Sequence, residues 1–65
     1  MDQFCCIWFE SRQQWFVLFE DGSLLDGFPS IGHAANAAYS HLRLGESDFD
    51  VTEDTGTFYR YERTQ

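Results

Sequence analysis

The sequence predicts an α+β fold, a small antiparallel sheet of about five short strands with one helix packed on one face. Two short apolar runs divided by polar residues open the chain, which is typical of two strands joined by a hairpin. An alanine-rich segment with helical spacing occupies the middle, and alternating apolar and polar residues follow it. We see no linker and no repeat, so residues 1–65 are expected to form one domain in the order strand, strand, strand, helix, strand, strand.

The first three strands are expected at residues 4–9, 15–19 and 24–28. The first two runs are too short for helices and are rich in aromatic and β-branched residues, which favour strands. Asp21-Gly22 is a strong turn signal after the second run. Gly27 interrupts the third run, which is therefore the weakest of the three predicted strands.

A helix is expected between Ser30, a good N-cap residue, and Gly45, a good residue to follow a helix C-terminus. Apolar residues recur between them at helical spacing and form one face. These residues are Ile31, Ala34, Ala35, Ala38 and Leu42. Because alanine is small, this face is slim and lets the helix lie close to the sheet.

The last two strands are expected at residues 48–53 and 58–63. Phe49 and Val51 alternate with Asp48, Asp50 and Thr52, which is typical of a half-buried strand with one wet face. The first two strands differ, because they are apolar on both faces. One helix covers only one side of a sheet, so the other side is covered by curvature of the sheet, by a second subunit in a homodimer, or by a partner.

The charge balance excludes several classes of function. Eleven acids face four arginines and no lysine, which gives a net charge of −7. Direct binding of nucleic acid or of an anionic membrane needs a cationic surface, so neither is expected. The N-terminus lacks the basic start and apolar core of a signal peptide, and no apolar run approaches the ~20 residues of a membrane span. Adjacent Cys5 and Cys6 point to opposite faces of a strand and cannot easily bond to each other, so a reducing cytoplasm is the expected location.

Signals for catalysis and for metal binding are also missing. His33 and His41 lie too far apart around the predicted helix to reach one metal ion. Residues 48–53 resemble the start of a calcium loop but place Glu53 where that loop requires glycine. No nucleophile motif or phosphate-binding loop occurs. We therefore expect no enzymatic activity, no cofactor and no metal.

Two groups of acids are the candidate partner-binding residues. The first group consists of Glu46, Asp48, Asp50, Glu53 and Asp54. The second consists of Glu20, Asp21 and Asp26. Asp48 and Asp50 are expected to form a short ladder of charge on one strand face. Tyr59 and Tyr61 lie close to these acids in sequence and are candidate binding anchors. Whether the two groups merge into one surface is open at this point.

These acids, the small size of the chain and its lack of lysine resemble the small acidic, phage-encoded inhibitors that include the DNA-mimicking anti-CRISPR proteins. The resemblance is one of character over the full length, because that class shares no motif. It implies that the protein occupies the basic DNA-binding or PAM-reading surface of a Cas protein in the cytoplasm of a bacterial host. It also implies inhibition by steric and electrostatic competition, by a monomer or a dimer.

Two main hypotheses follow. In the first, a non-enzymatic acidic protein binds a basic, nucleic-acid-binding surface of a partner protein through the acid groups and inhibits it. In the second, a small interaction or dimerisation module uses an exposed aromatic sheet face, and the acids serve only solubility. A third hypothesis, a small ligand pocket among the aromatic residues, is also open.

Overall fold

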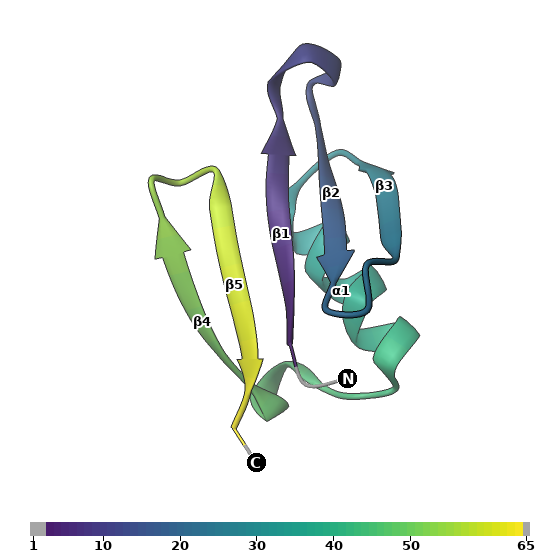
Figure 1. Ribbon diagram of the computed structural model, residues 1–65, viewed down its shortest axis with the longest axis vertical. Helices are drawn as coiled ribbons and strands as arrows, with labels where there is room; N and C mark the ends of the chain where they lie inside the picture. Colours follow the sequence, from purple (N-terminus) through teal and green to yellow (C-terminus); the bar gives the residue numbers. More distant parts are fainter. Residues whose placement is uncertain (1–2, 65) are drawn as a thin grey trace.

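The computed structural model describes residues 3–64 and confirms the predicted α+β class, with five antiparallel strands and one helix. The strands are β1 (Gln3–Phe9), β2 (Gln14–Phe19), β3 (Leu24–Phe28), β4 (Phe49–Asp54) and β5 (Phe58–Arg63). The helix α1 (Ile31–Leu42) follows β3, and short 3-10 turns precede β2 (Glu10–Arg12) and β4 (Glu46–Asp48). The strands lie in the order β3-β2-β1-β5-β4, so the first and last strands in sequence pair at the centre of the sheet (Figure 1).

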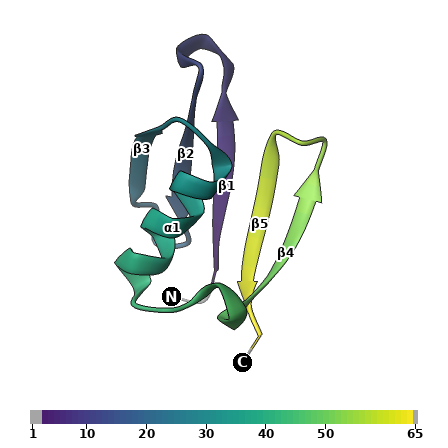
Figure 2. The same cartoon turned by 180° about the vertical axis from the view of Figure 1, so that it is seen from behind.

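The helix lies on one face of the sheet and covers only part of it. It contacts β1, β2 and β3. Figure 2 shows α1 in front of these strands, with the hairpin of β4 and β5 standing beside it. The opposite side of the sheet, which faces the viewer in Figure 1, has no helix over it. The β4–β5 hairpin therefore has no helix over either of its sides, whereas β1, β2 and β3 are covered on one side (Figures 1 and 2).

The core lies between α1 and the sheet, and Phe4 is at its centre. Phe4 pairs with Phe19 on β2 and with Tyr61 on β5, so the three side chains share the helix-covered face. The rings of Phe4 and Tyr61 stack with centroids 4.5 Å apart, and Phe49 meets Phe4 edge-on at 5.2 Å. The buried residues are Phe4, Cys6, Val17, Phe19, Ala34, Ala35, Ala38, Phe49 and Tyr61. The three alanines let the helix backbone approach the sheet, as their size predicts.

The beginning of the helix agrees with the prediction, and its end does not. Ser30 is the N-cap as predicted, and its Oγ accepts a hydrogen bond from the His33 backbone N–H at 3.2 Å. The predicted role of Gly45 is wrong, because the helix ends at Leu42 and Arg43 takes the left-handed conformation with φ of 60°. Leu44 then packs against the core, which requires the chain to turn before it reaches the glycine.

The acidic segment before β4 also departs from the prediction. Asp48 belongs to the 3-10 turn rather than to the strand, and its Oδ2 accepts a hydrogen bond from the Gly45 backbone N–H at 2.7 Å. The predicted ladder of Asp48 and Asp50 is therefore wrong. Phe49 is buried as predicted, but Val51 on the same side is 49% exposed because α1 does not reach over β4.

Curvature of the sheet does not cover its second face. Phe9, Leu18 and Leu24 on that face keep 39%, 37% and 56% of their surface exposed. The adjacent cysteines point to opposite sides as predicted, with Cys6 buried in the core and Cys5 half-buried on the second face. Of the three predicted ways to cover this face, curvature is excluded within residues 3–64.

Candidate functional site

The side of the sheet opposite α1, here called the open face, has an apolar centre. The strand registers place the apolar residues of β1, β2, β3 and β5 there side by side. They are Cys5, Ile7, Phe9, Phe16, Leu18, Leu24 and Phe58. Phe9 and Phe16 pack edge to face with ring centroids 6.0 Å apart. A contiguous apolar area of this kind on a small domain is typical of an interaction surface.

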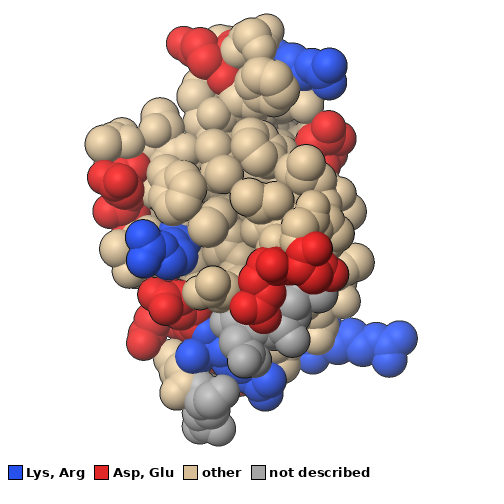
Figure 3. All heavy atoms as spheres, in the orientation of Figure 1, with Lys and Arg blue, Asp and Glu red and all other residues tan. Residues whose placement is uncertain are grey.

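Acidic side chains lie around this apolar centre. Figure 3 shows a broad uncharged area in the middle of the open face, with acidic residues near its margins. Asp26 on β3 lines a hollow of about 140 Å³ together with Phe9, Phe16 and Leu24. On the other side, Asp50 and Asp54 project from β4 and Glu62 from β5 on the same face of the sheet. These four acids are called the acidic rim, and Arg60 of β5 lies among them, opposite Thr52.

One cross-strand pair in the acidic rim places like charges together. Asp50 and Glu62 are directly opposite each other in the antiparallel pair of β4 and β5. Like charges in this position destabilise a sheet. A charge arrangement that costs stability is commonly kept because the charges serve binding.

The two predicted groups of acids do not merge into one patch. Asp26 lies on β3 and Asp50 on β4, and these strands are the two outer strands of the sheet. Glu20 and Asp21 lie in the turn after β2, where the Asp21 carboxylate accepts hydrogen bonds from the Ser23 backbone N–H at 2.9 Å and hydroxyl at 2.7 Å. These bonds lower the pKa of Asp21 and fix the turn. The acids of the two groups therefore lie in separate parts of the molecule.

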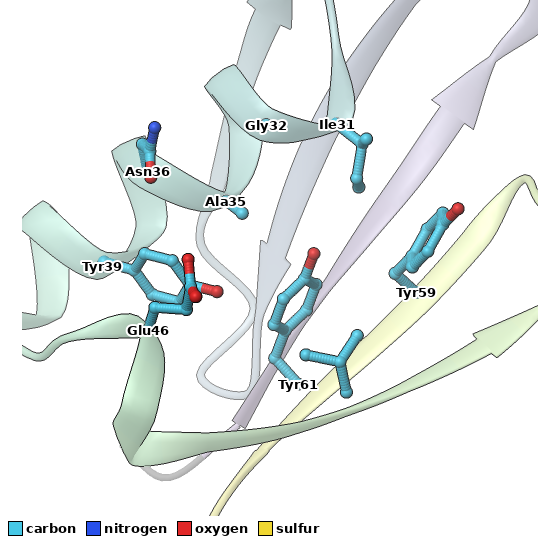
Figure 4. A pocket seen from close by; sticks show the side chains of 9 residues that line it. Ile31, Gly32, Ala35, Asn36, Tyr39, Glu46, Tyr59 and Tyr61 are labelled. Carbon is cyan, nitrogen blue, oxygen red and sulfur yellow. The ribbon is translucent and has the colours of Figure 1, made fainter.

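A second surface lies on the other side of the sheet, between α1 and the β4–β5 hairpin. It is a groove of about 470 Å³, here called the tyrosine groove. Its lining residues are Ile31, Gly32, Ala35, Asn36, Tyr39, Glu46, Val51, Tyr59 and Tyr61. Figure 4 shows Tyr61 between Tyr39 of the helix and Tyr59 of β5. The groove exists because the helix stops short of the hairpin.

The predicted site residues are thus divided between opposite sides of the sheet. Asp26, Asp50 and Asp54 belong to the open face, whereas Glu46, Tyr59 and Tyr61 line the tyrosine groove. Glu53 pairs with Tyr59 and so lies on the groove side of β4.

Sequence reasoning missed Tyr39 in the groove and did not assign the faces of Leu24 and Phe58. Tyr39 follows Ala35 by four residues, so its place on the apolar side of the helix was readable from the helical spacing. The face taken by Leu24 and Phe58 depends on strand pairing, which the sequence does not display.

Tyr39 and Tyr61 of the groove remain neutral phenols at neutral pH. Burial raises the pKa of Tyr39 above its ordinary value, and the negative charge of Glu46 raises it further. Burial also raises the pKa of Tyr61, with the neighbouring Cys6 adding to the effect. The polar groups that line the groove are three tyrosine hydroxyls, the Glu46 carboxylate and the Asn36 amide. Its remaining lining residues are apolar or glycine.

The structure gives the two histidines local partners. The His33 Nδ1 lies 2.7 Å from the Ser30 Oγ, and the His41 ring packs on Phe19 with centroids 4.7 Å apart. Within residues 3–64, no group of three His, Cys, Asp or Glu side chains is placed to hold a metal ion. Nor does this part of the chain contain a helix with the length and apolar character needed to cross a membrane.

Comparisons of the chain with protein-family models, with curated proteins and with solved structures gave no match. The function proposed below therefore rests on the two surfaces and their chemistry.

Proposed function

We propose that the protein is a non-enzymatic binding module that docks on a partner protein through its open face. The observation that supports this proposal is the apolar centre of the open face inside an acidic rim. Protein interfaces commonly combine an apolar centre with a polar margin that stays accessible to water. Phe9, Leu18 and Leu24 are the exposed apolar contacts that a partner would cover.

The charge of the rim selects the kind of partner. Asp26, Asp50, Asp54 and Glu62 surround the apolar centre, and the chain carries a net charge of −7. A second copy docked through the same face would bring two acidic rims together, which is unfavourable. A protein with an apolar patch surrounded by arginine and lysine satisfies both parts of the surface. We therefore favour a basic partner over a homodimer.

Basic surfaces of this kind are typical of proteins that bind nucleic acids. A domain seated on such a surface would exclude the nucleic acid by steric and electrostatic competition, as the resemblance to DNA-mimicking anti-CRISPR inhibitors implies. The directly opposed Asp50 and Glu62 support this extension, because a cationic partner relieves their repulsion. The absence of lysine leaves few cations to compete with the partner for these acids.

Two pairs of variants test the proposal. Leu24→Glu places a charge in the apolar centre, and Ser40→Glu places the same charge on the exposed side of α1. Asp50→Asn removes one rim charge, and Ser40→Lys changes the net charge equally on the helix. Each variant is used to capture proteins from a bacterial extract, and any captured protein is purified and its Kd measured at low and high salt.

We expect Leu24→Glu to weaken binding about tenfold or more, because it places an unpaired charge in a desolvated interface. Asp50→Asn should weaken binding chiefly at low salt, while both Ser40 variants bind as the wild type does. Equal binding by Leu24→Glu and Ser40→Glu contradicts the docking surface. A salt-resistant dimer of the wild type that Leu24→Glu disrupts, seen by sedimentation velocity, contradicts the basic partner and supports the homodimer.

A further inference from the structure

We propose that the tyrosine groove binds an arginine side chain of a peptide or protein partner. The groove lies on the side of the sheet opposite the open face, so this inference adds a second binding site to the proposed function. It rests on three features of the groove: aromatic walls held by the core, a carboxylate beside them, and the absence of any cation among its lining residues.

The aromatic walls are fixed by packing behind them. Tyr61 forms the floor of the groove and is 5% exposed, with its ring stacked on Phe4. Tyr39 stacks on Phe49 with centroids 5.6 Å apart, and Tyr59 meets Trp15 edge-on at 5.8 Å. These contacts hold Tyr39 and Tyr59 in place while leaving both residues partly exposed. A ligand therefore meets rings that do not have to be ordered on binding, which favours affinity.

The charge of the groove is negative. Figure 4 shows the Glu46 carboxylate beside the Tyr39 ring, on the side toward Tyr61. Glu53 of β4 pairs with Tyr59 of β5 and so lies on the groove side of the sheet. None of the nine lining residues is Lys or Arg. Aromatic faces carry partial negative charge and attract cations, so the rings and the carboxylate favour the same ligand.

Arginine fits this combination better than other cations. Its guanidinium group is planar, stacks on aromatic rings and donates two parallel hydrogen bonds to one carboxylate. It is also less strongly hydrated than an ammonium group, so it enters a partly apolar groove at lower cost. Ile31 and Val51 offer apolar surface for the aliphatic part of the side chain. The volume of about 470 Å³ leaves room for the backbone of a short peptide as well.

The test uses two blocked tripeptides, acetyl-Gly-Arg-Gly-amide and the same peptide with citrulline in place of arginine. Citrulline has nearly the shape of arginine but no charge. Each peptide is titrated into the ¹⁵N-labelled full chain, and the backbone amide shifts of residues such as Val51 and Tyr59 are followed by NMR. We expect the arginine peptide to shift the groove amides with a Kd on the order of 1 mM, and the citrulline peptide to bind at least about fivefold more weakly.

Four variants connect the binding to the groove. Glu46→Gln should weaken binding of the arginine peptide about fivefold, because the charged hydrogen-bond acceptor is lost. Glu10→Gln removes the same charge in the turn between β1 and β2 and should leave the Kd unchanged. Tyr59→Leu should weaken binding, whereas Tyr59→Phe, which keeps the ring, should not.

Equal binding of the two peptides would show that the groove takes a neutral ligand and would overturn the proposal. So would amide shifts confined to residues outside the groove, or a Kd that Glu46→Gln and Glu10→Gln change equally. Overlaid ¹⁵N spectra of the unbound variants verify that each is folded, so a loss of binding is not confused with a loss of structure.

Discussion

The part of the sheet under the helix and the β4–β5 hairpin differ in how their side chains are used. Beneath α1, Phe4, Val17 and Phe19 are almost completely buried. In the hairpin, Phe49 and Tyr61 belong to the core, while Val51 on the same side is half-exposed. The difference teaches that burial is concentrated where α1 packs on β1 and β2, and that Phe49 and Tyr61 are the hairpin's contribution to the core. The hairpin adds surfaces on both of its sides.

Simple dimensions explain this division. A helix with its side chains is about 10–12 Å wide, and neighbouring strands are about 4.8 Å apart, so one helix covers two or three strands. The sheet has five strands, and α1 lies on three of them. The remaining two strands leave the tyrosine groove beside the helix. A second helix would be needed to close it.

The largest expected effect contrasts the core with the open face. Phe4→Ala removes a ring that contacts Phe19, Tyr39, Phe49 and Tyr61, and it should lower the free energy of unfolding by about 3–5 kcal/mol. That loss is comparable with the whole stability of a small domain, so we expect the variant to be largely unfolded. Urea denaturation followed by circular dichroism measures the change.

Phe9→Ala is the matched control for this change, because the same truncation occurs on the open face, where Phe9 is already partly exposed. It should cost about 1 kcal/mol. Similar losses at the two positions would mean that the helix-covered side is not the main source of stability.

The next effect tests the slim face of the helix. Ala38 is completely buried against the sheet, and Ala38→Leu should lower the free energy of unfolding by about 1–3 kcal/mol because the added atoms have no room. Ala37→Leu makes the same change at a half-buried position and should shift it by less than about 0.5 kcal/mol. Thermal unfolding of both variants gives the comparison, and a Tm for Ala38→Leu equal to that of Ala37→Leu contradicts close packing of the helix.

The smallest effect is the difference between the two cysteines in how they make the free energy of unfolding depend on pH. Burial raises the pKa of Cys6 from 9.0 to about 12, so the folded state keeps the proton that the unfolded state loses. The stability from this group is complete below about pH 9 and is lost as the pH rises toward about 12, with a loss of roughly 1 kcal/mol reached near pH 9.7. Urea midpoints measured across this range should fall less steeply for Cys6→Ala than for the wild type.

Cys5 provides the contrast on the open face. Burial raises its pKa as well, but the nearby Arg60 opposes the shift. Cys5→Ala should therefore change the alkaline slope less than Cys6→Ala does. An identical slope for the wild type and both variants would show that the burial of Cys6 does not control its proton.

Much of the fold was predictable because its signals are local. The apolar runs of the strands, the turn at Asp21-Gly22 and the Ser30 N-cap each depend on a few neighbouring residues. The end of the helix was not predictable in this way, because Arg43 takes a left-handed conformation to let Leu44 reach the core. The residue types near the end of the helix do not display this packing of Leu44.

The arrangement of the site was less predictable than its residue types. The acids and tyrosines were recognised, but their faces depend on β5 pairing with β1, which joins the two ends of the chain. That pairing separates Asp26 from Asp50 and puts Tyr59 on the opposite side of the sheet from Asp54. The alternation of polar and apolar residues predicted Asp48 to be part of the strand. In the structure its carboxylate instead accepts a hydrogen bond from the Gly45 backbone N–H.

The order of the strands also leaves the sheet with two free edges, which bear on how copies of the protein behave in concentrated solution. β3 has an irregular register with β2 and is followed by Pro29, so it offers a poor template for another strand. β4 is longer and regularly paired along its inner side. Asp50, Glu53 and Asp54 place charge on both sides of this edge, so two copies repel each other before their backbones can pair. Variants that replace these three acids with neutral residues lose that repulsion, so edge-to-edge pairing is the hazard to watch when such variants are concentrated for storage or crystallisation.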